Sequence, residues 1–88
     1  MISKEIKVTN KLGLHARPAT MLVKTASKYK SRITLKKDEL SVDAKSIMGV
    51  LILAAQQGSK LILEVDGEDA EEAMAEVEKL FSTGFGED

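Results

Sequence analysis

One short segment of the chain combines the residue types needed for phosphoryl chemistry. It reads Gly13-Leu14-His15-Ala16-Arg17-Pro18-Ala19, and it contains the one histidine of the sequence. Pro18 suits the first turn of a helix, because its ring fixes φ and its missing N–H is not needed there. His15 is therefore expected immediately before a helix N-terminus, where free backbone N–H groups and the Arg17 guanidinium favour an anion.

A histidine at that position is suited to carry a phosphoryl group. The positive end of the helix disfavours the imidazolium ion, so a ring nitrogen of His15 stays nucleophilic near neutral pH. Such a nitrogen can accept a phosphoryl group and release it again, which divides one transfer into two steps. The alternative is that His15 is a surface or helix-capping residue without any chemistry.

Ser46 is the second candidate, because it precedes an apolar run that begins at Ile47. The simplest interpretation is a helix N-cap, in which the serine hydroxyl oxygen accepts a hydrogen bond from a backbone N–H. A phosphate on Ser46 would also be stabilised by the helix dipole, and it would add about two negative charges without melting the helix.

Hydropathy patterns predict the elements that position these residues. Alternation of apolar and polar residues predicts strands over 2–8, 32–36, 40–44 and 60–66, and helical spacing predicts helices from 16 for about three turns, over 47–55 and over 70–81. Lys4 interrupts the apolar row of the first strand, which favours a sheet edge. Asp69 and Glu72 resemble a capping box. Residues 84–88 are predicted to be a frayed tail.

This order of elements, β-α-β-β-α-β-α, predicts an α+β fold. Each predicted helix has one apolar face, so all three helices should cover one side of a single sheet and leave its other side in water. The result is an open-faced two-layer sandwich. The same order also fits a ferredoxin-like module, and composition does not choose between the two strand arrangements.

Composition narrows the class of protein. A length of 88 residues predicts a single domain over 1–88. With no cysteine and one histidine, neither a thiolate site nor an ordinary zinc site is expected, and no metal or cofactor is predicted. No apolar run is long enough for a membrane span, and the charged N-terminal residues do not resemble a secretory signal, so a cytoplasmic protein without membrane insertion is expected. A monomer is also expected.

Charge is unevenly distributed along the chain. Residues 1–45 carry a balance of +7 and residues 46–88 a balance of −8. This asymmetry predicts a basic docking face. Nucleic acid is not the expected partner, because three aromatic residues are too few for base stacking and do not alternate with basic ones. An acidic protein surface is the predicted partner.

The segment around His15 is followed by a second one, Ala44-Lys45-Ser46-Ile47-Met48-Gly49-Val50. Together they resemble the HPr family, the histidine-containing phosphocarriers of the bacterial phosphoenolpyruvate-dependent phosphotransferase system, and the similarity covers the whole chain. The resemblance implies that Enzyme I phosphorylates His15 on Nδ1 and that the phosphoryl group passes to acceptors of the Enzyme II A type. Arg17 would pair with the phosphate or with partner carboxylates. The protein would be a stoichiometric carrier and not an enzyme.

The resemblance also implies structure and regulation. It implies an antiparallel four-stranded sheet in the order 1-4-2-3, with three helices on one face. It makes Ser46 a target of HPr kinase/phosphorylase. It further places an exposed apolar docking patch beside His15, and a helix that is apolar on nearly every side of a one-sided layer cannot bury everything. The residues expected to dock partners are Thr20, Lys24, Ile47, Met48 and Leu51.

Three alternatives stay open at this point. Leu12 stands where many family members have a small polar residue, and this departure leaves the nitrogen-related regulatory branch of the same system beside sugar uptake. A second alternative is a regulatory binding protein that is controlled at Ser46 and makes little use of His15. The third is a small acyl-phosphatase-like hydrolase with Arg17 as its phosphate cradle, although no second polar group is predicted near Arg17.

Overall fold

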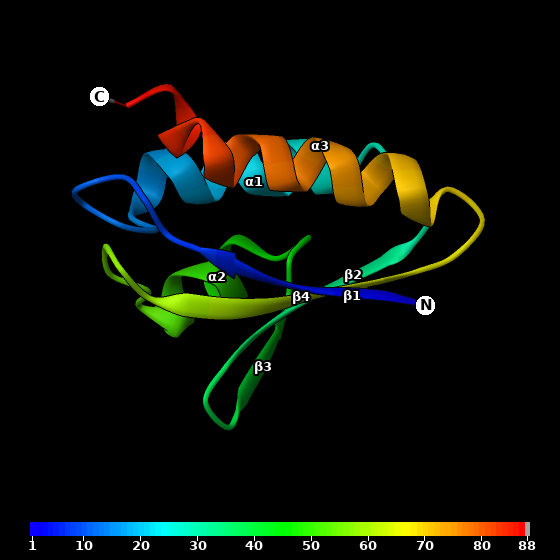
Figure 1. The fold of residues 1–88 in the computed structure, drawn as a ribbon, viewed down its shortest axis with the longest axis horizontal. Coiled ribbons are helices and arrows are strands. Elements are labelled where there is room, and N and C mark those ends of the chain that lie inside the picture. The colour runs from blue at the N-terminus through cyan, green and yellow to red at the C-terminus, as the bar shows by residue number, and fades with distance from the viewer. Residues whose placement is uncertain (88) are drawn as a thin grey trace.

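The helices of this protein pack on a single antiparallel sheet (Figure 1). A computed structural model describes residues 1–87. The strands are paired in the order β1-β4-β2-β3, as the family resemblance implied. The strands are β1 (Ile2–Lys7), β2 (Arg32–Lys37), β3 (Leu40–Asp43) and β4 (Lys60–Asp66). The helices are α1 (Ala16–Ala26), α2 (Ile47–Leu53) and α3 (Ala70–Ser82), and a short 3₁₀ helix, η1 (Gly84–Gly86), follows them. The predicted order of elements is confirmed.

β1 lies at an edge of the sheet, because β4 is its one neighbour in the strand order. The edge position that Lys4 indicated is therefore confirmed. The Lys4 side chain reaches past the apolar layer, and its Nζ lies 3.2 Å from Oε1 of Glu78 on α3. A lysine in this row is tolerated because the edge of the sheet gives its ammonium group access to water and to a carboxylate.

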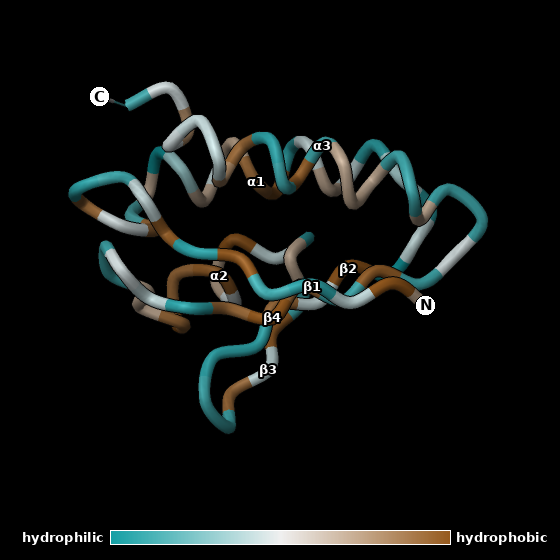
Figure 2. Tube along the Cα trace, in the orientation of Figure 1, coloured by the Kyte–Doolittle hydropathy of each residue, from teal (hydrophilic) through white to brown (hydrophobic). Residues whose placement is uncertain are grey.

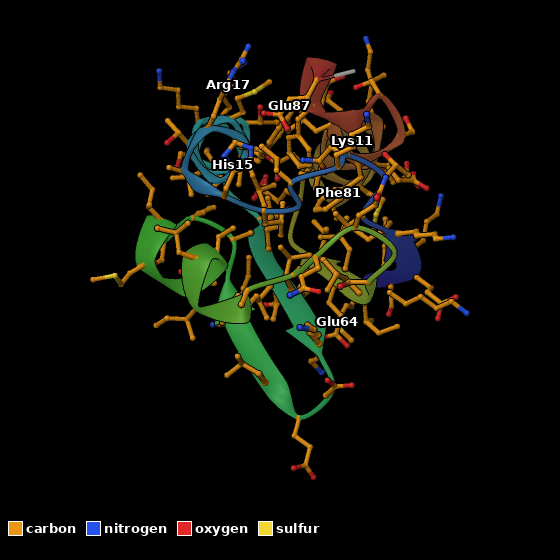
Figure 3. The ribbon with its side chains drawn as sticks, turned by 90° about the vertical axis from the view of Figure 1, so that its left-hand side faces the viewer. Lys11, His15, Arg17, Glu64, Phe81 and Glu87 are labelled. Atoms are coloured by element: carbon orange, nitrogen blue, oxygen red, sulfur yellow. The ribbon has the colours of Figure 1, made fainter. Side chains whose placement is uncertain are left out.

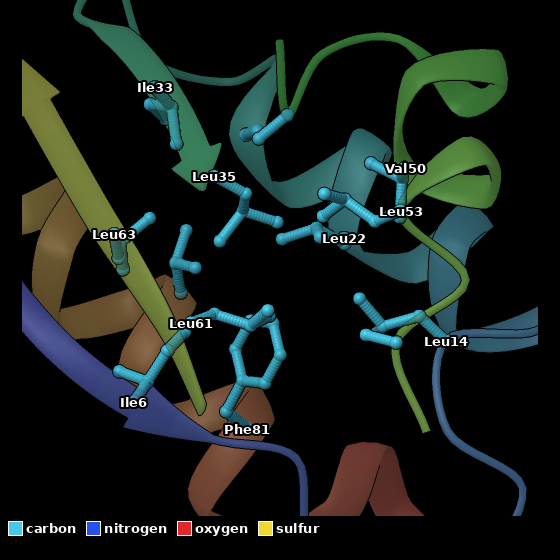
Figure 4. Close-up of a cluster of buried hydrophobic side chains, with 14 of the residues drawn as sticks. Ile6, Leu14, Leu22, Ile33, Leu35, Val50, Leu53, Leu61, Leu63 and Phe81 are labelled. Atoms are coloured by element: carbon cyan, nitrogen blue, oxygen red, sulfur yellow. The ribbon is translucent and has the colours of Figure 1, made fainter. Parts of the chain in front are cut away.

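The core lies between the sheet and the helices, and the alternation seen in the sequence produces it. Figure 2 shows apolar and polar residues alternating along the strands and around α1 and α3. In β4, Leu61, Leu63 and Val65 are fully buried, whereas Ile62 and Glu64 are half-buried. Figure 4 shows leucines of the sheet and of α1 and α2 meeting in this layer. Each buried large aliphatic side chain stabilises the fold by about 1.5–3 kcal/mol, which fixes the helices on the sheet.

The predicted frayed tail is wrong for residues 84–87, and Asp88 lies outside the described residues. Phe85 is 1% exposed and packs edge-to-face on Phe81, with ring centroids 4.9 Å apart. Gly84 and Gly86 flank it with φ values of 61° and 73°, which glycine adopts without strain. The glycines that made the segment look flexible therefore supply the turn that buries an aromatic ring.

The predicted capping box at the start of α3 is also wrong. Asp69 is the N-cap residue of α3, but its carboxylate makes no hydrogen bond to the helix it precedes. It accepts hydrogen bonds from the Lys30 N–H (2.9 Å), the Ser31 N–H (3.0 Å) and the Ser31 hydroxyl (2.6 Å). The Asp69 carboxylate binds Lys30 and Ser31, which are distant in sequence, in place of the N–H groups of its own helix. It thereby links the start of α3 to the segment before β2.

The second helix is shorter than predicted. α2 ends at Leu53, whereas the apolar run predicted an end near Ala55. Ala54 takes a left-handed conformation with φ of 50°, and its N–H donates to the Leu51 carbonyl, which closes the last turn. Ala55 stays buried and apolar although it is outside the helix, so hydropathy alone could not mark the boundary.

Candidate functional site

The loop before α1 holds His15 in a fixed place. Gly13 has a φ of 68°, and an added Cβ would collide with the backbone oxygen of Ala55, so glycine is required there. The Leu14 N–H donates to that same Ala55 oxygen at 2.9 Å. Leu14 itself is buried in the core. His15 follows as the N-cap residue of α1, with extended backbone angles.

The N-terminus of α1 is left open. The His15 side chain makes no capping hydrogen bond, and the first turn holds no acidic residue. Pro18 has no N–H, and the Ala19 N–H donates to the His15 carbonyl at 3.0 Å. Within residues 1–87, the N–H groups of Ala16 and Arg17 have no hydrogen-bond acceptor. Two unpaired amides at a helix N-terminus are suited to accept an anion.

A carboxylate contacts the His15 ring at Nε2. Nε2 of His15 lies 3.0 Å from Oε2 and 3.3 Å from Oε1 of Glu87. The buried Asn10 holds this carboxylate, because its Nδ2 donates to Glu87 Oε1 at 2.9 Å and to the Gly13 carbonyl at 2.8 Å. The Asn10 hydrogen bond, assisted by the charges of His15 and Arg17 and opposed by desolvation, holds the pKa of Glu87 below its ordinary value. Glu87 is therefore ionised at neutral pH.

The His15 ring is only partly exposed. Its side chain is 36% exposed, and the Glu87 side chain beside it is 16% exposed. Sequence reasoning missed Glu87 because it fell in the segment interpreted as a tail. The signal that could have found it is the phenylalanine that precedes it between two glycines, since Phe85 anchors that segment to the core.

Arg17 lies at the rim of a surface hollow next to His15. The hollow is lined by Lys11, Leu12, Arg17, Gly86 and Glu87. Figure 3 shows Arg17, His15, Glu87 and Lys11 at one end of the molecule, with Glu64 far away on the sheet. The expectation that no second polar group lies near Arg17 is wrong, because Lys11 and Glu87 share its hollow. The C-terminal segment brings the carboxylate there, and its position depends on tertiary packing.

Ser46 is the N-cap residue of α2, as predicted. Its hydroxyl oxygen accepts a hydrogen bond from the Gly49 N–H at 3.1 Å. Gly49 also lies close to β3, because a Cβ added there would stand 3.2 Å from Cβ of Val42. The serine is half-buried, and the helix it caps carries the residues predicted to dock partners.

Four residues of α2 leave large parts of their apolar side chains in water. Ile47 is 43% exposed, Met48 71% and Leu51 37%, whereas Val50 and Leu53 of the same helix are buried. Ile52, which was not predicted, is 59% exposed. We call Ile47, Met48, Leu51 and Ile52 the apolar patch. A helix of seven residues in a one-sided layer cannot turn every apolar side chain inward.

The neighbouring helix α1, which packs against α2, carries the predicted flanking residues. Lys24 is exposed, and Thr20 is half-buried with its hydroxyl donating to the Ala16 carbonyl at 2.8 Å. The Lys45 side chain is held in place, because its Nζ donates a hydrogen bond to the Tyr29 carbonyl at 2.7 Å.

Residues 1–87 contain no group of three or more histidine, cysteine or acidic side chains arranged to hold a metal ion. None of the helices in that part of the chain has the length and apolar character needed to cross a membrane. The candidate site consists of His15, the open end of α1, Arg17 and Glu87.

Comparison with known proteins identifies the family. A family model described as the PTS HPr component phosphorylation site matches residues 2–83. The chain belongs to the HPr family. The phosphocarrier protein HPr of Xylella fastidiosa (strain Temecula1) is 50% identical over 88 residues, which make up 100% of this chain and 99% of that protein.

Solved HPr structures agree with the fold. The crystal structure of HPr-C-His from Thermoanaerobacter tengcongensis has a TM-score of 0.96 and 45% identity, covering 100% of this chain and 99% of that one. An HPr dimer from the same organism has a TM-score of 0.80 and 46% identity, covering 99% and 100% of the two chains. HPr proteins are phosphocarriers of the phosphotransferase system and not catalysts in the usual sense. The matches favour none of the alternatives that the sequence left open.

Proposed function

We propose that this HPr protein accepts a phosphoryl group from phospho-Enzyme I on His15 and passes it to acceptors of the Enzyme II A type in sugar uptake. The observation that carries the proposal is the uncapped N-terminus of α1, which leaves two amide N–H groups unpaired beside the ring of His15. A helix end that its own N-cap residue does not satisfy is suited to a transient anion.

The chemistry follows from this arrangement. Nδ1 of His15 attacks the phosphorus, and the bond between phosphorus and the donor group of Enzyme I breaks with its electron pair returning to the donor. The phosphoryl oxygens accept hydrogen bonds from the N–H groups of Ala16 and Arg17 and pair with the Arg17 guanidinium. These donors are fixed before the reaction, so they stabilise the transferring group without reorganisation. The same steps in reverse deliver the group to the acceptor protein.

Docking uses the apolar patch and the basic residues around it. Partner proteins bury Ile47, Met48 and Leu51, while Thr20 lies at the border and Lys24 steers the acidic partner surface. We infer that the chain acts as a cytoplasmic monomer with one HPr domain over 1–88. Sedimentation equilibrium tests the monomer directly, because a dimer would double the measured mass.

Ser46 regulates this docking when HPr kinase/phosphorylase phosphorylates it. The hydroxyl lies at the start of the helix that carries the apolar patch. A phosphate there adds about two negative charges next to Ile47 and Met48 and repels an acidic partner. The helix itself tolerates the phosphate, because the charge lies at the positive end of its dipole.

The decisive experiment is incubation with phosphoenolpyruvate labelled in its phosphate and purified Enzyme I. One acid-labile label per chain, absent from His15→Ala and retained by Ser46→Ala, is the expected result. Adding an Enzyme II A protein should then remove the label. No label would support a purely regulatory protein, and continuous release of phosphate without an acceptor would support a hydrolase.

A further inference from the structure

Glu87 holds the His15 ring by one nitrogen only. Both oxygens of its carboxylate lie within 3.3 Å of Nε2. Nδ1 has no hydrogen-bond partner among residues 1–87. The two ring nitrogens are therefore in different environments, one paired with an anion and one open.

This asymmetry decides where the ring proton lies. An ionised carboxylate only accepts hydrogen bonds, so the contact is favourable when Nε2 carries the proton. The lone pair of the neutral ring is then on Nδ1. Asn10 fixes the carboxylate in this position through Oε1, and Phe85 anchors the segment that carries it. The carboxylate is thus rigidly presented and does not belong to a loose terminal arm.

We propose that Glu87 is a positioning residue for phosphoryl transfer: it fixes the His15 tautomer with Nδ1 unprotonated, and it balances the positive charge of the ring once Nδ1 is phosphorylated. The proposal rests on the function proposed above for His15. A carboxylate that orients a histidine and stabilises its imidazolium form is a general device of enzyme active sites.

The charge balance of the transfer explains the second role. When Nδ1 bonds to phosphorus, the donor group keeps the electron pair of the broken bond and Nε2 keeps its proton, so the ring becomes cationic. When the phosphoryl group leaves for an acceptor, the pair of the Nδ1–P bond returns to Nδ1 and a neutral ring is released. If Nε2 had lost its proton, an imidazolide anion would have to leave, and that leaving group is much poorer.

Glu87 is the negative charge that offsets several positive charges near the His15 ring. Arg17 from α1 and Lys11 from the preceding loop line the same hollow, and the open end of α1 is also positive. All three oppose a cationic ring. Glu87 is the carboxylate of residues 1–87 that contacts the ring, and it offsets them.

The test compares Glu87→Gln with Glu64→Gln in the full chain. Glu64 pairs with Lys36 on the sheet, far from His15 (Figure 3), so it controls for the loss of one acidic charge. Ring protonation at Nε2 in the phosphorylated protein is followed by the ³¹P chemical shift as pH is raised. The midpoint should fall by roughly one pH unit in Glu87→Gln, the size typical of losing one nearby opposite charge, and should not move in Glu64→Gln.

Transfer to the acceptor gives a second measurement. At a pH below both ³¹P midpoints, Glu87→Gln should transfer at least as fast as the unchanged protein. At a pH above both midpoints its relative rate should be roughly tenfold lower, because one pH unit is a tenfold change in the protonated fraction. Equal ³¹P midpoints, or the same rate ratio at both pH values, would overturn the proposal.

A measurement on the unphosphorylated protein tests the role of Glu87 independently of the function proposed for His15. Ring ¹⁵N shifts at pH 8.5 report the tautomer of His15, and Glu87→Ala should lower the population with the proton on Nε2. If Enzyme I fails to label His15 at all, the proposed function fails, and the ¹⁵N shifts still show whether Glu87 sets the tautomer. An unchanged tautomer population would contradict the role of Glu87 in either case.

Discussion

The N-termini of α1 and α2 are the same kind of helix end used in two different ways. At α2, the Ser46 hydroxyl accepts the Gly49 N–H, so the helix is capped by its own N-cap residue. At α1, the N-cap residue His15 makes no such bond, because its ring is turned to Glu87. The closed end stabilises its helix by about 1 kcal/mol. The open end gives up that stabilisation and keeps its amides available for an anion.

The most damaging change to the open end is removal of the imidazole. His15→Ala should reduce phosphoryl acceptance by at least about a thousandfold, the scale on which loss of a reacting nucleophile acts. The melting temperature should stay within about 4 °C, since the ring is partly exposed and caps nothing. Labelling by Enzyme I and a thermal scan on one sample check both. A large drop in melting temperature would show that His15 is mainly structural.

The next largest effect should come from Arg17. Arg17→Glu should slow transfer to and from both partners by roughly 100-fold and Arg17→Lys by about 10-fold, because one charge-assisted hydrogen bond contributes about 1.5–3 kcal/mol. Arg32→Glu on β2 is the matched control for the charge change, since Arg32 is the other arginine of the chain and is exposed. Single-turnover kinetics measure the rates. If Arg32→Glu slows transfer equally, Arg17 acts only through net charge.

Local sequence patterns predicted the N-termini of α1 and α2. They did not predict contacts between residues that are far apart in the sequence. The position of His15 followed from Pro18 and the change of hydropathy period, and the position of Ser46 followed from the apolar run after it. Glu87 could not be found in this way, because it reaches His15 across 72 positions of the chain. The direction of the Asp69 carboxylate was equally non-local, since a capping signal does not exclude a better partner such as Ser31.

A charge at the closed end should have a smaller effect than either change at the open end. Ser46→Asp should slow phosphorylation by Enzyme I roughly fivefold at low salt, because the carboxylate repels an acidic partner at the apolar patch. Its melting temperature should be equal or higher, since aspartate is also a good N-cap and suits the dipole.

Added salt should restore much of that rate by screening. Ser41→Asp, on exposed β3, is the control for the charge alone. Ser46 is only a cap if the rate of Ser46→Asp is unchanged, or if it falls because the protein unfolds.

The smallest effect concerns the N-terminus of α3, where Asp69 makes no capping hydrogen bond and the first turn holds Glu71 and Glu72. Hydrogen bonds from the Ser31 hydroxyl and then the Lys30 N–H lower the pKa of Asp69 from 3.8 to about 2. A depressed pKa in the folded state means that the carboxylate stabilises the fold above its ordinary pKa, and that this stabilisation is lost as pH falls toward 2. Asp69→Asn should therefore lower the melting temperature by a few degrees at pH 7 and by much less at pH 2.5. The exposed neighbour Glu68, changed to Gln, should shift it little at either pH.

Transfer by Asp69→Asn should be normal at pH 7, because α3 begins at the opposite end of the molecule from the start of α1 (Figure 1). Because the two helix ends are far apart, this variant tests whether a loss of stability alone can slow phosphoryl transfer. If a few degrees of lost stability at α3 slowed transfer, the effects predicted at α1 and α2 could also be indirect. Thermal scans at the two pH values, with labelling by Enzyme I at pH 7, distinguish these outcomes. A melting-temperature difference that persists undiminished at pH 2.5 would show that Asp69 acts by its shape and not by its charge.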